Sequence, residues 1–137
     1  LLLKVNGNAT EDAFHFIGGE IAKGIRGALP ESCPLARARH ILDFGCGLGR
    51  VSSRLLQDAP EAQVVGFDID PAMLHWSRRL LPDPRIRFVS STLPLAAGGF
   101  DLITVVSVFT HLDETTDFWL SEINRLLAND GVAFITY

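Results

Sequence analysis

The sequence predicts an α/β fold in which helices flank both faces of a doubly wound, mostly parallel β-sheet. Short apolar segments, which are typical of buried parallel strands, alternate along the chain with longer segments whose apolar residues recur at helical spacing. A turn with glycine at positions 45, 47 and 49 follows the first apolar segment, and a predicted helix follows the turn. These features indicate strand–helix–strand crossovers, which place a ligand at the carboxyl ends of the strands.

Length and composition favour a single domain, 1–137, in which residues 1–39 form a helical lead-in to the sheet. Apolar residues make up 47% of the 137 residues, which is enough for a hydrophobic core. The net charge is −4 and no basic cluster occurs, so we expect no nucleic-acid partner. We also expect no membrane span and no metal site, because the apolar runs are short and the two cysteines and four histidines lack ligand spacing. A reducing cytoplasm is the expected location.

The first half of the chain is expected to contain three helices and two strands. Thr10, followed by two acids, is typical of a helix start, and apolar residues recur at helical spacing as far as Ile25. A loop over 27–34 ends this helix. A strand over 41–44 follows, and it is apolar except for Asp43. A helix over 50–59, a second strand over 63–69 and a third helix over 71–81 come next, and Asp70 caps and Pro71 begins this third helix.

The second half is expected to contain three strands and one helix. Prolines at 82 and 84 end the third helix, and strands follow over 85–90 and 100–109. Apolar residues at helical spacing predict a helix over 113–128. The sequence Asn129-Asp130-Gly131 is typical of a turn, and it leads to a fifth strand over 132–137.

Adjacent glycines at 18 and 19 fall inside the first predicted helix. Each costs ~1 kcal/mol relative to alanine in a helix interior, so their presence needs a reason. The sequence favours a close approach of a cofactor or substrate to this helix, and the alternative is a break in the helix.

The spacing of the glycine turn decides which kind of nucleotide-type ligand it suits. A dinucleotide fingerprint requires the pattern G-x-G-x-x-G. When the pattern is counted from Gly45, its third glycine position holds Arg50, and when it is counted from Gly47, that position holds Ser52. The chain instead reads D-x-G-x-G-x-G over 43–49. At the end of the second strand, Asp68 is placed to accept hydrogen bonds from both ribose hydroxyls of such a ligand.

The segment 43–49, together with Val65-Gly66-Phe67-Asp68-Ile69-Asp70, resembles motifs I and II of the class I S-adenosylmethionine-dependent methyltransferases. The resemblance covers about residues 12–137. It implies a Rossmann-like fold, S-adenosylmethionine as cofactor and S-adenosylhomocysteine as product. The family core has seven strands, and the last two are missing here. We therefore expect either a C-terminally truncated piece of a longer protein or a homodimer that covers the exposed edge of the fifth strand.

The resemblance also implies a role for each part of the cofactor site. Asp43 and the glycine loop would face the methionine end, with Asp43 otherwise a structural acid for the loop amides. Ile69 would lie against the adenine, with ordinary core packing as the alternative. Where the family often has an acid after the third strand, Ser90-Ser91-Thr92 offers only hydroxyl and backbone groups. The expected cofactor-binding residues are Asp43, Gly45, Cys46, Gly47, Gly49, Asp68, Ile69, Ser91, Thr92 and Ser107.

The segment 107–112, Ser-Val-Phe-Thr-His-Leu, resembles the motif after the fourth strand in a group of bacterial small-molecule methyltransferases. His111 is the candidate catalytic base, because imidazole suits proton transfer near neutral pH. A base is needed only when the acceptor must lose a proton. The alternative is that Thr110 and His111 cap the helix that follows.

The function expected from the sequence is transfer of a methyl group from S-adenosylmethionine to a small-molecule acceptor. A catalytically silent module that binds S-adenosylmethionine is the alternative in another class. An NAD-dependent oxidoreductase is disfavoured, because Arg50 and Ser52 break its glycine pattern.

Overall fold

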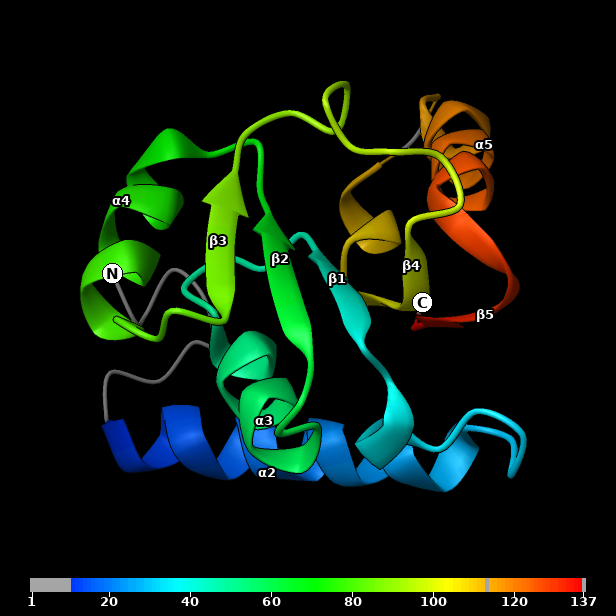
Figure 1. Ribbon diagram of the computed structural model, residues 1–137. Helices are drawn as coiled ribbons and strands as arrows, with labels where there is room; N and C mark the ends of the chain where they lie inside the picture. The colour runs from blue at the N-terminus through cyan, green and yellow to red at the C-terminus, as the bar shows by residue number, and fades with distance from the viewer. Residues whose placement is uncertain (1–10, 113, 137) are drawn as a thin grey trace.

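The computed structural model describes residues 11–112 and 114–136 (Figure 1). The expected helix start at Thr10 lies outside the described residues. All predicted helices and strands are present, together with two short 3-10 helices. In chain order they are α2 (Glu11–Ala28), η1 (Leu35–Arg37), β1 (His40–Phe44), α3 (Arg50–Asp58), β2 (Gln63–Phe67), α4 (Pro71–Leu80), β3 (Ile86–Val89), β4 (Phe100–Val105), η2 (Phe109–His111), α5 (Thr116–Leu126) and β5 (Leu127–Ile135).

The five strands form one parallel sheet in the order β3-β2-β1-β4-β5, which confirms the predicted doubly wound architecture. β1 lies in the centre, where Leu42 is in register with Val65 of β2 and Ile103 of β4. The chain moves outward from β1 through β2 to β3 and then returns to the other side of β1 to begin β4. This reversal opens a crevice at the carboxyl ends of β1 and β4, the usual place for a ligand in such sheets.

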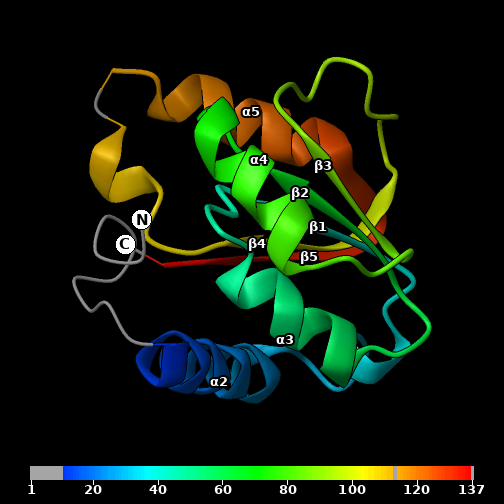
Figure 2. The same cartoon turned by 90° about the vertical axis from the view of Figure 1, so that its left-hand side faces the viewer.

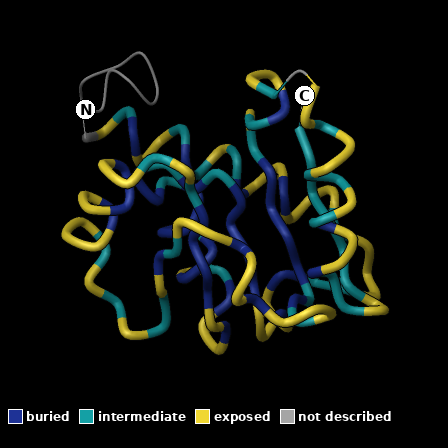
Figure 3. Tube along the Cα trace, turned by 90° about the horizontal axis from the view of Figure 1, so that it is seen from above, coloured by how far each residue is buried: buried dark blue, intermediate teal, exposed yellow. Residues whose placement is uncertain are grey.

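Alternate residues of the central strands face opposite layers of helices. Ile41 packs in a cluster with Leu55 of α3 and Ile25 of α2, whereas Leu42 packs with Ile123 of α5. Figure 2 shows α2 and α3 on one side of the sheet and α5 on the other, and α4 lies beside β3. The most buried parts of the chain therefore gather in the middle of the molecule, as the dark segments of Figure 3 show.

The fifth strand differs from the prediction, because β5 starts directly after α5 and includes the sequence expected to form a turn. Leu127 pairs with Phe100, but the next pair is Val132 with Leu102, so β5 bulges between them. A Cβ on Gly131 would lie 2.7 Å from the Phe100 carbonyl oxygen, and this close approach explains the glycine. Within the described part of the chain, β5 pairs only with β4 and has no fully buried residue.

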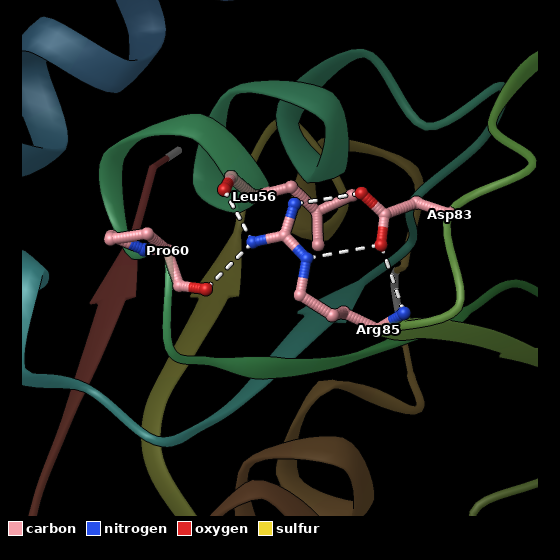
Figure 4. A network of polar contacts seen from close by, with 4 residues as sticks. All are labelled: Leu56, Pro60, Asp83 and Arg85. Atoms are coloured by element: carbon pink, nitrogen blue, oxygen red, sulfur yellow. Dashed lines mark hydrogen bonds and ion pairs between the residues drawn. The ribbon is translucent and has the colours of Figure 1, made fainter.

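Polar networks fix the amino ends of the strands, opposite the crevice. The Arg85 guanidinium donates to both carboxylate oxygens of Asp83 and to the carbonyls of Leu56 and Pro60, which ties the start of β3 to the end of α3 (Figure 4). The hydrogen bonds from Arg85 lower the pKa of Asp83. At the same end, Asp101 accepts the backbone N–H groups of residues 39 and 40, each at 2.8 Å. Among the described helices, none is both long and apolar enough to cross a bilayer.

Candidate active site

The turn between β1 and α3 is a loop whose alternating glycines hold left-handed backbone conformations. Gly45, Gly47 and Gly49 have φ angles of +74°, +53° and +80°, a region that favours glycine. The Gly45 N–H donates to the Phe67 carbonyl at 2.8 Å and so fastens the loop to the end of β2. A Cβ on Gly45 would overlap the Val108 side chain, whereas a Cβ on Gly47 would meet no atom within 4 Å. The backbone of Gly47 therefore borders open space, where a ligand can approach closely.

Asp68, at the end of β2, joins this loop to the start of α4. Its Oδ2 accepts the Gly47 N–H at 2.8 Å, and its Oδ1 accepts the Asp70 N–H at 2.9 Å. Asp70 in turn caps α4, because its Oδ1 accepts the Ala72 N–H at 2.9 Å. The prediction that Asp70 caps this helix is therefore confirmed. Asp68 also has a structural task that the sequence did not indicate.

Asp43 lies beneath the loop and is 2% exposed. Its carboxylate accepts the Ser52 hydroxyl at 2.5 Å and the Thr104 hydroxyl at 3.1 Å. Burial raises the pKa of Asp43, while the hydrogen bonds from Ser52 and Thr104 act in the opposite direction. The alternative role predicted for Asp43 was to accept hydrogen bonds from the loop amides. The hydroxyl groups that it does accept belong to α3 and β4.

Two adjoining cavities lie at the carboxyl ends of the strands. One has a volume of about 290 Å³ and a polar lining that includes Asp43, Gly47, Arg50 and Asp70. The other has a volume of about 250 Å³ and a mainly apolar lining. The residues that line both cavities are Gly45, Asp68, Val106, Ser107 and His111. The site is therefore one cleft with a polar half and an apolar half, and Asp68 lies where they meet.

Aromatic rings form one side of the apolar cavity. The rings of Phe44 and Phe67 lie 4.7 Å apart, and Trp119 of α5 contacts both, at 5.2 and 5.7 Å. Ile69 also lines this cavity and is 69% exposed, so the alternative that it is an ordinary core residue is wrong. Val108 lines the same cavity from the segment after β4. These side chains would suit a flat, apolar ligand group.

Ser107 follows β4 and has a φ of +56°, the single positive value among the described residues other than glycine. Its N–H donates to the Thr136 hydroxyl at 2.9 Å, and its carbonyl accepts the Thr110 hydroxyl at 3.3 Å. A left-handed serine costs free energy, and such strain is concentrated at functional sites. Because Ser107 lines both cavities, its conformation fits the predicted place in the site.

His111 lies in η2, is exposed, and lines both cavities, so the structure brings the candidate base to the cleft. The helix after it begins later than expected, at Thr116, with Thr115 as its N-terminal flanking residue. Thr110 and His111 therefore do not cap that helix, and this alternative is wrong.

Ser91 and Thr92 are not brought to the cleft. The Ser91 hydroxyl accepts the Leu93 N–H at 3.2 Å, and neither Ser91 nor Thr92 lines the two cavities. Thr92 is buried, and its carbonyl accepts a hydrogen bond from Arg125 of α5 at 3.4 Å. Their predicted contact with adenine therefore has no geometric support in this structure.

Cys46 and Gly49 of the loop lie against apolar side chains of the protein interior. The Cys46 side chain is buried in a cluster with Leu74 and Phe88, and burial raises the pKa of its thiol. A Cβ on Gly49 would collide with the Leu81 side chain, and Gly49 lines neither cavity. Cys46 does line the polar cavity, so of the two only Cys46 keeps a place at the cleft.

The structure adds residues to the cleft that the sequence did not identify, namely Phe44, Arg50, Val51, Phe67, Asp70, Met73, Val106, Val108, Leu112 and Trp119. Arg50 could have been predicted from its position, because it directly follows the last loop glycine. Trp119 could not have been predicted, because only the packing of α5 brings it to the strand ends.

The structure gives Gly18 of α2 a different explanation from the two that the sequence suggested for this pair of glycines. The helix continues through both, so it is not broken. A Cβ on Gly18 would lie 2.9 Å from the Arg50 carbonyl oxygen, so the close approach is to α3 rather than to a ligand. A Cβ on Gly19 would meet no atom within 4 Å.

Comparisons with known proteins agree on one family. A family model described as a methyltransferase domain matches residues 42–135. Malonyl-[acyl-carrier protein] O-methyltransferase from Legionella pneumophila is 33% identical over 105 residues, which cover 72% of this chain and 36% of that protein. Demethylmenaquinone methyltransferase from Thermus thermophilus is 34% identical over 98 residues, which cover 68% of this chain and 44% of that protein. The chain thus spans less than half the length of these two relatives.

Among solved structures, a protein from Methanococcus maripaludis superposes on this chain with a TM-score of 0.76. That protein is provisionally assigned as an S-adenosyl-L-methionine-dependent methyltransferase, and the identity is 20%. The match covers 89% of this chain and 56% of the other. At this identity the likeness concerns the fold.

Proposed function

This chain belongs to the class I S-adenosylmethionine-dependent methyltransferase family, and from that premise we propose that it binds S-adenosylmethionine and transfers the methyl group to a small-molecule acceptor. One observation carries the proposal: Asp68 lies where a polar and an apolar cavity meet. The cofactor has a ribose between a charged amino-acid group and an aromatic base. The order of chemical groups along the cleft therefore matches the order along the cofactor.

The residues of the cleft fit each part of this ligand. Each Asp68 oxygen accepts one backbone N–H and keeps a lone pair for a ribose hydroxyl. The apolar cavity, which Ile69 and Val108 line, suits the adenine. The carboxylates of Asp43 and Asp70 in the polar cavity suit the positive charges of the methionine end.

The bound cofactor supplies a methyl group on a positively charged sulfur, an already activated carbon. The protein must align the acceptor with that carbon and exclude water. Val106, Ser107 and His111 line both cavities, so the acceptor is expected to approach between them. His111 would take a proton from an acceptor that loses one on methylation, such as a hydroxyl, and would be dispensable for other acceptors.

The acceptor is proposed only as a class. The relatives named above act on a malonyl group carried by a protein and on demethylmenaquinone, as their names state. An acceptor panel for this chain should therefore begin with small carboxylic acids and quinols. The catalytically silent module is the second candidate, because the cleft residues named above are assigned mainly to cofactor binding and only His111 to proton transfer.

Isothermal titration with S-adenosylmethionine, S-adenosylhomocysteine and NAD tests the cofactor assignment. Binding of NAD, with no heat from either sulfur ligand, would overturn it. Turnover across the acceptor panel then separates the two candidates, because a silent module binds both sulfur ligands and forms no S-adenosylhomocysteine. The exposed edge of β5 is also a proposed site of homodimerisation, and light scattering that finds a monomer at all concentrations would remove that proposal.

A further inference from the structure

The polar cavity contains one cation among its acids. Asp43, Asp68 and Asp70 line it together with Arg50, and no other Lys or Arg among the described residues lines either half of the cleft. The cofactor carries two positive groups and one carboxylate at this end. The acids suit the positive groups, so the carboxylate needs a partner of opposite charge.

Arg50 is half-buried at the start of α3. Within the part of the chain that the structure describes, its guanidinium makes no hydrogen bond or ion pair. Asp43 is near, but its oxygens accept the hydroxyls of Ser52 and Thr104. Burial lowers the pKa of Arg50, and only the charge of Asp43 acts in the other direction. An unpaired cation in such surroundings costs free energy that a ligand carboxylate would recover.

Arg54, one turn further along α3, is different. Its guanidinium donates to the Gln57 side chain at 2.9 Å and to the His15 carbonyl at 3.0 Å. Arg54 lines neither cavity. The two arginines thus have different roles. Arg54 joins α3 to α2, whereas Arg50 lines the cleft.

The close contact between α2 and α3 fixes the stem of Arg50. A Cβ on Gly18 would lie 2.9 Å from the Arg50 carbonyl oxygen and 3.0 Å from its Cγ. The same carbonyl accepts the Ser53 hydroxyl at 2.9 Å. The backbone and first side-chain atoms of Arg50 are therefore confined from two directions.

We propose that Arg50 binds the carboxylate of the cofactor's amino-acid group and that Gly18 is a positioning residue for Arg50. A guanidinium matches a carboxylate through two parallel hydrogen bonds, which a backbone loop alone does not provide. The inference rests on the proposed function, because it requires S-adenosylmethionine to occupy the polar cavity.

A pair of ligands isolates the interaction. Decarboxylated S-adenosylmethionine keeps the ribose, adenine, sulfonium and ammonium groups and lacks only the carboxylate. We expect Arg50→Met to weaken the affinity for S-adenosylmethionine by about ten- to a hundredfold, and that for the decarboxylated ligand by less than about threefold. Arg50→Lys should give an intermediate loss, since a point charge remains without the planar fork. Isothermal titration measures all of these affinities. Arg54→Met is the matched control, and it should leave the affinity for both ligands unchanged.

Each outcome has a separate meaning. If the unmodified chain binds neither ligand, the proposed function fails before this inference is reached. If the unmodified chain binds S-adenosylmethionine and Arg50→Met weakens both ligands equally, or neither, the role of Arg50 is refuted and its charge serves only Asp43. A folded far-ultraviolet circular dichroism spectrum is required of each variant. If Arg50→Met does not fold, Arg50→Lys and Gly18→Ala provide the same test.

Gly18→Ala and Gly19→Ala are a matched pair for the positioning role. An alanine at Gly18 must displace Arg50, whereas an alanine at Gly19 enters open space. We expect Gly18→Ala to weaken S-adenosylmethionine at least threefold more than the decarboxylated ligand, and Gly19→Ala to leave both affinities unchanged. An equal effect of Gly18→Ala on the two ligands would overturn the positioning role while leaving that of Arg50 intact.

Discussion

Replacing Asp68 with alanine should damage both the fold of the site and its affinity for cofactor. The change leaves the N–H groups of Gly47 and Asp70 without their carboxylate partner. It also removes the proposed acceptor of the ribose hydroxyls. Because the two losses have different readouts, this one variant tests the structural and the binding role together.

The magnitudes follow from the count of hydrogen bonds. A hydrogen bond to a charged group contributes about 1.5–3 kcal/mol, so loss of one ribose bond weakens cofactor binding by at least about tenfold and loss of two by at least about a hundredfold. The two loop amides border an open cleft, where water can replace the carboxylate. The free energy of unfolding should therefore fall by only about 1–2 kcal/mol.

Isothermal titration measures the affinity, and urea denaturation followed by circular dichroism measures the free energy of unfolding. Asp70→Ala is the matched control, because it removes the cap of α4 and keeps the Asp68 carboxylate. It should cost ~1 kcal/mol of stability. Because the Asp70 carboxylate lines the polar cavity and has no proposed bond to the ribose, its removal should weaken the cofactor less than Asp68→Ala does. Asp68→Asn should fall between the two, since an amide retains one acceptor oxygen and brings a second donor toward an N–H group.

A loss of stability in Asp68→Ala with cofactor affinity within a factor of two would refute the ribose role. Asp68 would then serve only the two loops, and the ribose would bind elsewhere. A larger loss of affinity in Asp70→Ala than in Asp68→Ala would show that the roles at the end of β2 are reversed.

Three further variants test other parts of the molecule. Ser107→Gly should raise the free energy of unfolding by up to about 1 kcal/mol in urea denaturation, because glycine adopts a φ of +56° without strain; a loss of stability would mean that the serine side chain outweighs the strain. Asp43→Asn should gain stability relative to the unmodified chain as pH rises above the ordinary carboxyl pKa of 3.8. Burial raises the pKa of Asp43, so the folded state binds a proton that the unfolded state has lost, and stability falls through that window; a constant difference in urea midpoints at pH 4, 5, 6 and 7 would contradict this. The hydrogen bond from Arg125 lowers the pKa of Glu122 to about 2, so its contribution is complete above the ordinary value of 4.5 and is lost as pH falls toward 2. Glu122→Gln should flatten the acid part of the stability profile over that range, and an unchanged slope would exclude the pair as its source.

Local sequence signals predicted most of the fold and the centre of the cleft. The glycines of the first turn and the acid at Asp68 mark strand ends, and strand ends meet at one edge of a parallel sheet. Their proximity therefore follows from chain order alone. The cap at Asp70 is equally local, because it depends only on the residues directly after it.

The features that sequence reasoning missed depend on contacts between distant segments. Asn129-Asp130-Gly131 is a turn sequence by composition, but pairing with β4 draws it into β5 as a bulge. Gly18 reads as a helix defect until α3 is placed against it. Thr92 follows the third strand as expected, yet its contact with Arg125 binds it to α5. In each case tertiary packing overrides a correct local preference.

The hydrogen bond from Ser107 to Thr136 sets the order in which the site can be completed during synthesis. The strands of the centre, β1, β2 and β4, are translated before β5, but Ser107 has its N–H partner only after Thr136 has been added to the chain. Thr136 is itself held by its own N–H, which donates to the Val105 carbonyl at 3.0 Å. At about 5–20 residues per second, a few seconds pass between the addition of Ser107 and that of Thr136, and the cleft cannot be completed within that interval. A ligand that recognises the finished cleft stabilises the chain only after that interval.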